Sequence, residues 1–259
     1  MINVTDITAY LYCPRKFYLE KIKGLKQPPT KPMIEGKIRH DVLEVFSKNE
    51  KDFVINFIQK PKNLEKEFIK FLNELIHNTF FNNSQIIKSF SISQSELKNK
   101  ILDSMQNDIK LRAEIIEKSM SQGLLGEELW HGLKPKYISE MPVESLSLRL
   151  RGRVDRVMLA DEIIPFELKT REIKKVYETD EIQITAYAML LEEKFQKPVH
   201  FGILESGNKK HEIIITNENK NKVIELINEI KNLSSPKFPG NFSKCQSCPW
   251  QEQCEQLDE

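Results

Sequence analysis

Two carboxylates and one lysine share a face of a predicted β-hairpin. The segments SLSLRLRGRVDRVML and IIPFELKT alternate apolar and polar residues around a turn at Asp161, a pattern typical of an antiparallel hairpin with one buried face. A three-residue loop at 160–162 sets Asp155 opposite Glu167, and Lys169 follows on the same face. Cross-strand neighbours lie about 5 Å apart at Cβ, so both carboxylates can hold one divalent cation.

These three residue types suit hydrolysis. A cation between Asp155 and Glu167 would lower the pKa of a bound water and neutralise a phosphate oxygen, while Lys169 would orient the nucleophile or the developing charge. The alternative is a solvated strand face on which acidic and basic residues pair across the hairpin. Arg156 breaks the alternation, and the pattern does not explain it. The apolar residues expected to face the core are even-numbered: Leu146, Leu148, Leu150 and Val154.

The four cysteines form a second cluster of chemical interest. Cys245, Cys248 and Cys254 lie within ten residues of one another, and Cys13 is more than two hundred residues away. Three local thiolates and one distant thiolate would make a metal site that joins the two ends of the chain. Structural zinc more often uses two close pairs of ligands, whereas the division here is one plus three. Zinc and an iron-sulfur cluster both stay open, and a disulfide is a third alternative.

Composition excludes several classes of function. The 259 residues include 39 basic and 38 acidic side chains, and a net charge of +1 gives no overall attraction to polyanions. Neither GxxxxGK[ST] nor GxGxxG occurs, which argues against ATP and NAD binding. No apolar run reaches the roughly 18 residues that span a bilayer, and the start resembles no leader. We therefore expect a cytoplasmic protein without membrane contact, whose cysteines bind metal.

The surrounding segments predict an α/β fold. A helix at 33–47 places His40 on one face with Gly36 and Glu44. Residues 51–121 have helical periodicity, and strands and helices follow from Tyr137 onward. We predict four parts, namely N-terminal helices at 1–40, a helical insertion at 41–135, a core with a mixed central sheet at 136–235, and a cysteine-bearing segment at 236–259.

Four motifs in order resemble those of RecB-like nucleases of the PD-(D/E)xK superfamily. They are G36-x-x-x-H40, G152-R-V-D155, E167-L-K169 and Q183-x-x-x-Y187. The resemblance implies a restriction-endonuclease-like mixed sheet flanked by helices, and Lys169 would assist the attacking water. It implies Mn²⁺ or Mg²⁺ bound by His40, Asp155, Glu167 and the carbonyl of Leu168. An imidazole ligand suits Mn²⁺ better than Mg²⁺.

Gln183 and Tyr187 have two interpretations. The resemblance implies that both contact the active site or the DNA strand. Alternatively, Gln183 closes a capping box begun by Asp180, and Tyr187 is an ordinary core aromatic residue.

The cysteine spacing resembles that of one subgroup of these nucleases. One distant and three local cysteines resemble the CRISPR-associated RecB-like exonucleases with a four-cysteine iron-sulfur cluster, which favours a [4Fe-4S] cluster over zinc at Cys13, Cys245, Cys248 and Cys254. Such a cluster would be structural, because thiolates saturate its iron. The resemblance further implies a single-stranded DNA exonuclease, acting 5′ to 3′ in CRISPR spacer acquisition beside the integrase proteins. A non-hydrolytic DNA-binding adaptor and a repair or recombination nuclease are the alternatives, and a homo-oligomer stays open.

A basic, aromatic segment precedes the helical insertion. Residues 10–23 interleave three lysines and one arginine with three tyrosines and one phenylalanine, a combination suited to phosphates and unstacked bases. The alternative is an amphipathic helix with aromatic residues in the core. The predicted DNA contacts are Tyr10, Arg15, Lys16, Arg153, Gln183 and Tyr187.

Overall fold

The computed structural model describes residues 1–169, 173–206, 209–236 and 242–258. Its centre is a mixed sheet in the order β1-β3-β4-β5-β6, with β2 paired to β3. Pairs β1–β3 and β4–β5 are parallel, and the other pairs are antiparallel. The strands are β1 (Ile2–Asn3), β2 (Lys136–Ser145), β3 (Leu150–Leu159), β4 (Ile163–Leu168), β5 (Phe201–Ser206) and β6 (Lys209–Ile214). The expected mixed sheet is therefore present.

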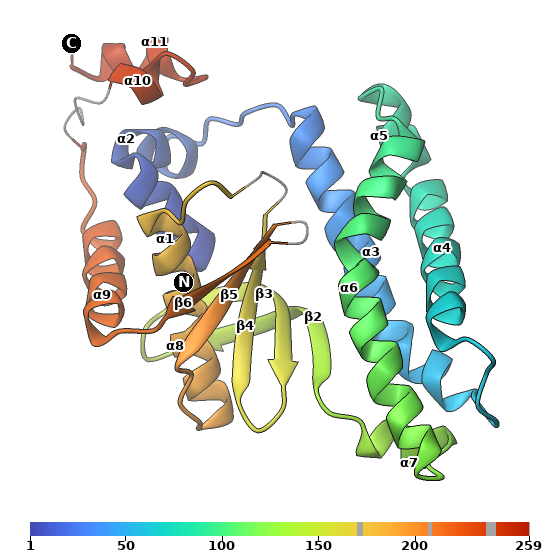
Figure 1. Ribbon diagram of the computed structural model, residues 1–259. Coiled ribbons are helices and arrows are strands. Elements are labelled where there is room, and N and C mark those ends of the chain that lie inside the picture. Colours follow the sequence, from blue (N-terminus) through green and yellow to red (C-terminus); the bar gives the residue numbers. More distant parts are fainter. Residues whose placement is uncertain (170–172, 207–208, 237–241, 259) are drawn as a thin grey trace.

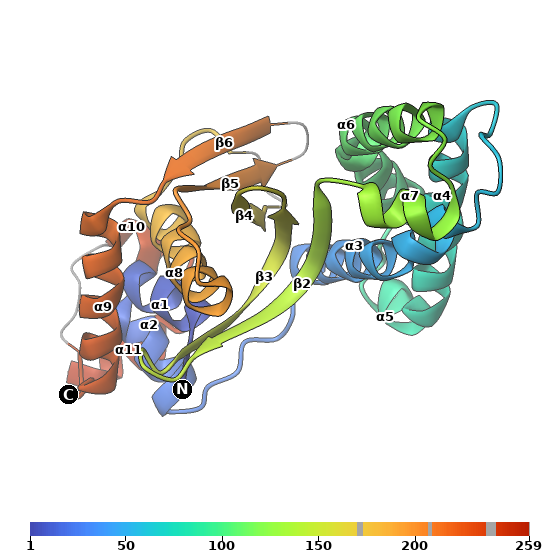
Figure 2. The ribbon, with the colours of Figure 1, turned by 90° about the horizontal axis from the view of Figure 1, so that it is seen from below.

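Three helices pack on one side of this sheet (Figures 1 and 2). They are α1 (Val4–Tyr12), α8 (Glu178–Phe195) and α9 (Asn217–Lys231). One apolar cluster joins them to the strands and includes Val4, Leu150, Tyr187 and Leu226. The second N-terminal helix meets the C-terminal segment: α2 (Pro14–Phe17) and a π-helical turn (Tyr18–Ile22) lie near α10 (Phe242–Cys245) and α11 (Gln251–Glu255). A short 3-10 turn, Gln256–Asp258, follows α11.

The helical insertion lies on the other side of the sheet (Figure 2). Its elements are α3 (Lys31–Ile55), α4 (Leu64–Asn82), α5 (Ser84–Ser89), α6 (Gln94–Ser121) and α7 (Gly126–Gly132). Local capping helps to define them, since the side chain of Asn63 accepts the Lys66 N–H over 2.8 Å at the start of α4. The expected boundary after residue 40 falls inside α3, so one continuous helix joins the N-terminal part to the insertion.

Strand β2 was not predicted, and its presence corrects the hairpin. Leu146 and Leu148 lie in the turn between β2 and β3 instead of on a buried strand face, and Leu146 is 78% exposed. Arg149 ends that turn with φ of 54°. None of the described helices combines the length and the apolar composition needed to cross a membrane.

The simple alternation in β3 was also wrong. Val154 and Val157, which are three positions apart, belong to the same apolar cluster, whereas strict alternation would put them on opposite faces. The irregularity lies at Asp155 and Arg156, and the residue facing Asp155 on β2 is Glu140, with φ of 52°. With this distortion, Asp155 contacts His40 of α3, and Arg156 contacts Asp108 of α6.

Candidate active site

The register of β3 and β4 places Asp155 opposite Glu167. The ladder runs from Leu159–Ile163 to Arg156–Phe166, and its next pair in order is Asp155–Glu167. The loop is the three-residue one that the sequence predicted, with the Ala160 N–H donating to the Glu162 carbonyl over 3.0 Å. Two carboxylates are thereby held side by side on neighbouring strands.

Asp155 and Glu167 are both largely buried, and one oxygen of Glu167 lacks a partner among the described residues. Asp155 accepts the Leu168 N–H through Oδ2 over 2.7 Å. Burial and the neighbouring charge of Glu167 nevertheless raise the pKa of Asp155 well above its usual range. Glu167 is 7% exposed, and its buried Oε2 atom has no hydrogen-bond partner among the described residues. A buried carboxylate oxygen without a partner is costly, and a bound cation would remove that cost.

His40 reaches this pair from α3. Its Nδ1 atom lies 2.7 Å from Glu140 Oε1 and 3.7 Å from Asp155 Oδ1. Burial alone would lower the pKa of His40, but its hydrogen bond with Glu140 and the charges of Asp155, Glu140 and Glu167 raise it overall. One ligand atom from each of His40, Glu140 and Asp155 lies within 4.8 Å of the other two. These side chains could hold a divalent cation.

Sequence reasoning missed Glu140. The signal was the alternation in KYISEMPVES, where Met141, Val143 and Ser145 are buried and Pro142 and Glu144 are exposed. Recognising this segment as a strand antiparallel to β3 would have placed Glu140 next to Asp155.

Lys169 sits at the other side of the carboxylates. Its Nζ atom donates to Glu167 Oε1 and to Gln183 Oε1, each over 3.0 Å, and lies 3.3 Å from Asp180 Oδ1. Burial alone would lower the pKa of Lys169, but the charges of Glu167 and Asp180 more than offset this and raise it. Lys169 therefore stays a cation near neutral pH.

The structure connects Gln183 and Tyr187 to Lys169. Gln183 Nε2 donates to the Tyr187 hydroxyl over 3.4 Å, while its carbonyl oxygen binds Lys169. Asp180 is the third residue of α8 and accepts the Tyr177 N–H over 3.2 Å, so it begins no capping box that Gln183 could close. Tyr187 is also a core residue, at 2% exposed.

Gly152 is required by the packing of Tyr187. A Cβ atom at Gly152 would lie 2.8 Å from Cε1 of Tyr187 and 2.9 Å from Cγ2 of Val4. Contacts this short are not tolerated without movement, so the glycine lets α8 approach β3 closely.

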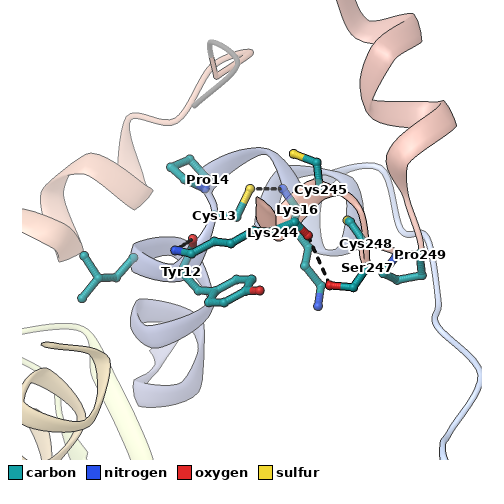
Figure 3. Close-up of a pocket in the computed structure, with 10 residues that line it drawn as sticks. Tyr12, Cys13, Pro14, Lys16, Lys244, Cys245, Ser247, Cys248 and Pro249 are labelled. Atoms are coloured by element: carbon teal, nitrogen blue, oxygen red, sulfur yellow. Dashed lines mark hydrogen bonds between the residues drawn. The ribbon is translucent and has the colours of Figure 1, made fainter. Parts of the chain in front are cut away.

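Three of the four cysteines lie together where α2 meets the C-terminal segment (Figure 3), and Cys254 is close enough to affect the Cys245 thiol. A cavity of about 250 Å³ is lined by Cys13, Cys245 and Cys248. Desolvation and the nearby thiols of Cys254, Cys13 and Cys248 raise the pKa of the Cys245 thiol. Four thiols gathered in this way form a donor set that fits a thiolate-bound metal centre.

Arg15 has a different setting from the one expected for a DNA contact. It is 2% exposed, and its guanidinium donates to the carbonyls of Pro236 and Cys254 over 3.0 and 2.9 Å. These bonds join α2 to the C-terminal segment. Tyr10 packs edge-on against Phe17, with 5.7 Å between ring centroids. Both residues therefore serve packing in this structure.

Lys16 and Arg153 are better placed for a ligand. Lys16 lines an open groove of about 380 Å³ together with Tyr12, Gln183 and Lys169. The Arg153 side chain is 60% exposed, with Nη1 3.7 Å from Glu140 Oε2.

Comparison with known proteins agrees with this geometry. The sequence pattern of the PD-(D/E)XK nuclease superfamily matches residues 1–255. The chain belongs to this superfamily. The match spans the helical insertion and all four cysteines as well as the sheet.

Two curated relatives are CRISPR-associated. A CRISPR-associated exonuclease Cas4 from Francisella tularensis subsp. novicida is 31% identical over 119 residues, which is 44% of this chain and 60% of that protein. A CRISPR-associated exonuclease Cas4/endonuclease Cas1 fusion from Leptospira interrogans is 29% identical over 141 residues, which is 48% of this chain and 26% of the fusion. The match to this chain thus spans 60% or less of the length of each of these relatives. The crystal structure of SSO0001 aligns with a TM-score of 0.34 and 17% identity, over 63% of this chain and 80% of that one.

Proposed function

We propose that this member of the superfamily is a metal-dependent DNA exonuclease that degrades single-stranded DNA from the 5′ end. The observation that carries the proposal is the placement of Asp155 and Glu167 on adjacent strands with Lys169 at 3.0 Å from Glu167. Both carboxylates and the Lys169 side chain are largely buried, which argues against a solvated strand face. A buried pair of carboxylates beside a lysine instead suits phosphodiester hydrolysis.

The cation site would use His40, Asp155, Glu167 and the carbonyl of Leu168. The fit rests on the unpartnered oxygen of Glu167 and on the crowding that raises the pKa of Asp155. A bound Mn²⁺ or Mg²⁺ ion would supply Lewis acidity, lowering the pKa of a bound water and neutralising a phosphate oxygen.

Lys169 acts as a hydrogen-bond donor and as a positive charge in this proposal. Its raised pKa keeps Nζ protonated, so it cannot take a proton from the attacking water. It can instead hold that water through an N–H bond or stabilise charge on the phosphate. Gln183 keeps Nζ pointed at Glu167, and Tyr187 in turn fixes the amide of Gln183.

The groove beside Lys169 suits a single strand. It runs from Lys169 and Gln183 to Tyr12 and Lys16 on the N-terminal helices, and Tyr12 and Lys16 also line the cysteine cavity. Tyr12 is 44% exposed. Lysines for phosphates and an exposed aromatic ring for a base are the usual elements of single-strand binding.

We further propose a [4Fe-4S] cluster at Cys13, Cys245, Cys248 and Cys254. The division into one distant and three local cysteines supports the cluster over zinc, because structural zinc more often uses two close pairs of ligands. A cluster would bind each thiolate to a different iron. Its role would be to hold α2 against the C-terminal segment.

The biological setting is proposed from the relatives. Both are named CRISPR-associated exonucleases, and one is fused to the endonuclease Cas1. We infer that this chain acts in the cytoplasm in CRISPR spacer acquisition and associates with a Cas1-type integrase. The retained Asp155, Glu167 and Lys169 set favours a hydrolase over a non-hydrolytic adaptor, because a protein that only binds DNA has no need of it.

The direct test is digestion of single-stranded oligonucleotides by anaerobically purified protein with Mn²⁺. Phosphorothioate linkages would block either the 5′ or the 3′ end. We expect the 5′ block to protect the strand and the 3′ block not to, and the duplex of the same sequence to be degraded slowly. Protection by the 3′ block alone would reverse the proposed polarity, and tight binding without any cleavage would favour the adaptor.

A further inference from the structure

We propose that Glu140 is a direct ligand of the divalent cation, a third carboxylate beside Asp155 and Glu167. This inference rests on the proposed function and deepens it by adding one ligand to the site. The register supports it first. Ser139 pairs with Arg156 and Met141 pairs with Val154, so Glu140 lies opposite Asp155 on β2. Glu140, Asp155 and Glu167 therefore form one row across three adjacent strands.

The distances at Glu140 suit shared coordination. Glu140 Oε1 lies 2.7 Å from His40 Nδ1, and the same nitrogen lies 3.7 Å from Asp155 Oδ1. All three ligand atoms lie within 4.8 Å of one another. Ligands at about 2.1 Å from one ion are separated by roughly 3 to 4 Å. Only small side-chain adjustments would bring the imidazole and both carboxylates onto a common ion.

The unpartnered oxygen of Glu167 is an independent sign of a cation. Glu167 is more than nine-tenths buried, and its Oε2 atom has no hydrogen-bond partner among the described residues. Lys169 already neutralises the other oxygen, Oε1. The charge of Lys169 is shared with Asp180, so it cannot balance the whole carboxylate row. A divalent ion held by His40, Glu140 and Asp155 would add positive charge beside Glu167.

The backbone of Glu140 is also specialised. Its φ of 52° lies in the left-handed region, which a non-glycine residue inside a strand rarely adopts. Its side chain is 11% exposed and is directed to His40. The ion pair with Arg153 does little to stabilise this arrangement, because the Arg153 side chain is 60% exposed and its Nη1 atom is 3.7 Å from Glu140 Oε2.

A simpler role for Glu140 would be to orient His40 through the hydrogen bond to Nδ1. The two roles predict different behaviour of Glu140→Gln. The glutamine keeps an oxygen that can bind Nδ1, but it loses the charge and most of the affinity for a hard cation. Glu140→Ala removes both functions.

The test is Mn²⁺ binding to the full-length protein, measured by calorimetry and by the electron paramagnetic resonance signal of free Mn²⁺. We expect Glu140→Gln to weaken Mn²⁺ binding by about 10- to 100-fold, close to the effect of Glu140→Ala. Glu144→Gln is the matched control, because Glu144 is an exposed residue of the same strand, and it should bind Mn²⁺ like the wild type. Melting curves in chelator confirm that each variant is folded.

The outcomes separate the inference from the proposed function. Wild-type affinity in Glu140→Gln together with weak binding in Glu140→Ala would reduce Glu140 to a positioning residue for His40 and overturn the inference. Wild-type affinity in both variants would also overturn it. A wild-type protein that binds no Mn²⁺ would instead contradict the proposed metal-dependent function.

Discussion

Arg156 of β3 donates to Asp108 of α6 over 2.6 Å, and this ion pair joins the helical insertion to the strand residue next to Asp155. Arg156 also donates to Glu205 of β5 over 2.6 Å and lies over the Phe166 ring, 4.5 Å from its centroid. The Arg156 side chain is only 12% exposed. The residue that broke the alternation in the sequence therefore has a structural role, which is to hold the insertion on the central sheet.

Asp108→Asn should loosen that junction. Removing one partner of a buried pair can cost about 3 to 5 kcal/mol, and because Asp108 is 28% exposed we expect roughly 1 to 3 kcal/mol. The measurement is urea unfolding. Asp103→Asn is the control on the same helix, since Asp103 is exposed. Equal stability of the two variants would show that the pair does not hold the junction.

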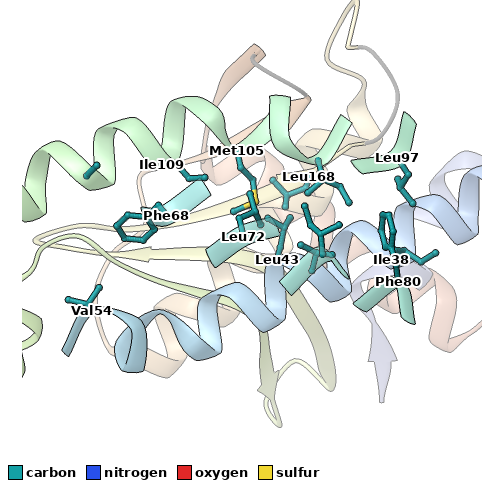
Figure 4. Packing of buried hydrophobic residues seen from close by; sticks show 14 of the residues in the cluster. Ile38, Leu43, Val54, Phe68, Leu72, Phe80, Leu97, Met105, Ile109 and Leu168 are labelled. Atoms are coloured by element: carbon teal, nitrogen blue, oxygen red, sulfur yellow. The ribbon is translucent and has the colours of Figure 1, made fainter. Parts of the chain in front are cut away.

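The insertion could be predicted as helical, but its packing against the central sheet could not be predicted. Its helical periodicity is clear in the sequence, yet its apolar cluster also contains Ile38 and Leu43 of α3 and Leu168 of β4 (Figure 4). Leu168 lies between Glu167 and Lys169, the proposed catalytic residues of β4 and its end. Because this contact joins residues far apart in the chain, local periodicity does not reveal it, and replacing the insertion by a linker would expose Leu168.

Asp155→Asn should stabilise the metal-free protein. The raised pKa means that folded Asp155 binds its proton more tightly than the unfolded chain does, so stability in chelator falls as the pH rises above about 4. Asparagine keeps an acceptor for the Leu168 N–H and removes the charge. We expect a melting temperature about 2 to 4 °C higher for each kcal/mol of repulsion relieved. Parallel pH profiles of wild type and variant in EDTA would refute this explanation.

Cys13→Ser should remove the proposed iron centre and destabilise both ends of the chain. Anaerobically purified wild-type protein is expected to be brown and to contain iron and sulfide, and the variant should lose both. By analogy with a cross-link across a long loop, the loss is about 3 to 5 kcal/mol. Glu167→Ala is the control and should keep its iron. Colourless wild-type protein with stoichiometric zinc would replace the cluster by a zinc site.

Lys16 and Arg15 are sequence neighbours with different predicted roles. Lys16→Ala should weaken single-strand binding and reduce its salt dependence by about 0.7 in the log–log slope, because Lys16 lines the groove. Arg15→Ala should instead lower the melting temperature, because its guanidinium joins α2 to the C-terminal segment. Fluorescence anisotropy and melting curves on the two variants test this pair. Identical profiles would mean that the structure does not separate their roles.

The sequence predicted the parts of the site that depend on local order. The hairpin loop sets Asp155 opposite Glu167, and helical spacing puts Gln183 and Tyr187 on one face, where Gln183 contacts both Tyr187 and Lys169. Glu140 depended on an unrecognised strand pairing, and the burial of Arg15 depended on contacts with residues more than two hundred positions away. The alternation in KYISEMPVES does mark β2 as a strand, but a short window of sequence does not show which strand it pairs with or that Arg15 is buried.

The most direct test of the account is cleavage of end-labelled single-stranded DNA by the anaerobic protein in Mn²⁺ or in EDTA. The wild type should cleave only with Mn²⁺. Asp155→Ala, Glu167→Ala and Lys169→Ala should each lose activity by about 10³-fold or more while keeping their circular dichroism spectra, because the three side chains form one hydrolytic unit. Wild-type rates in all three variants, or cleavage that persists in EDTA, would contradict the assignment of this site as the metal-dependent nuclease centre.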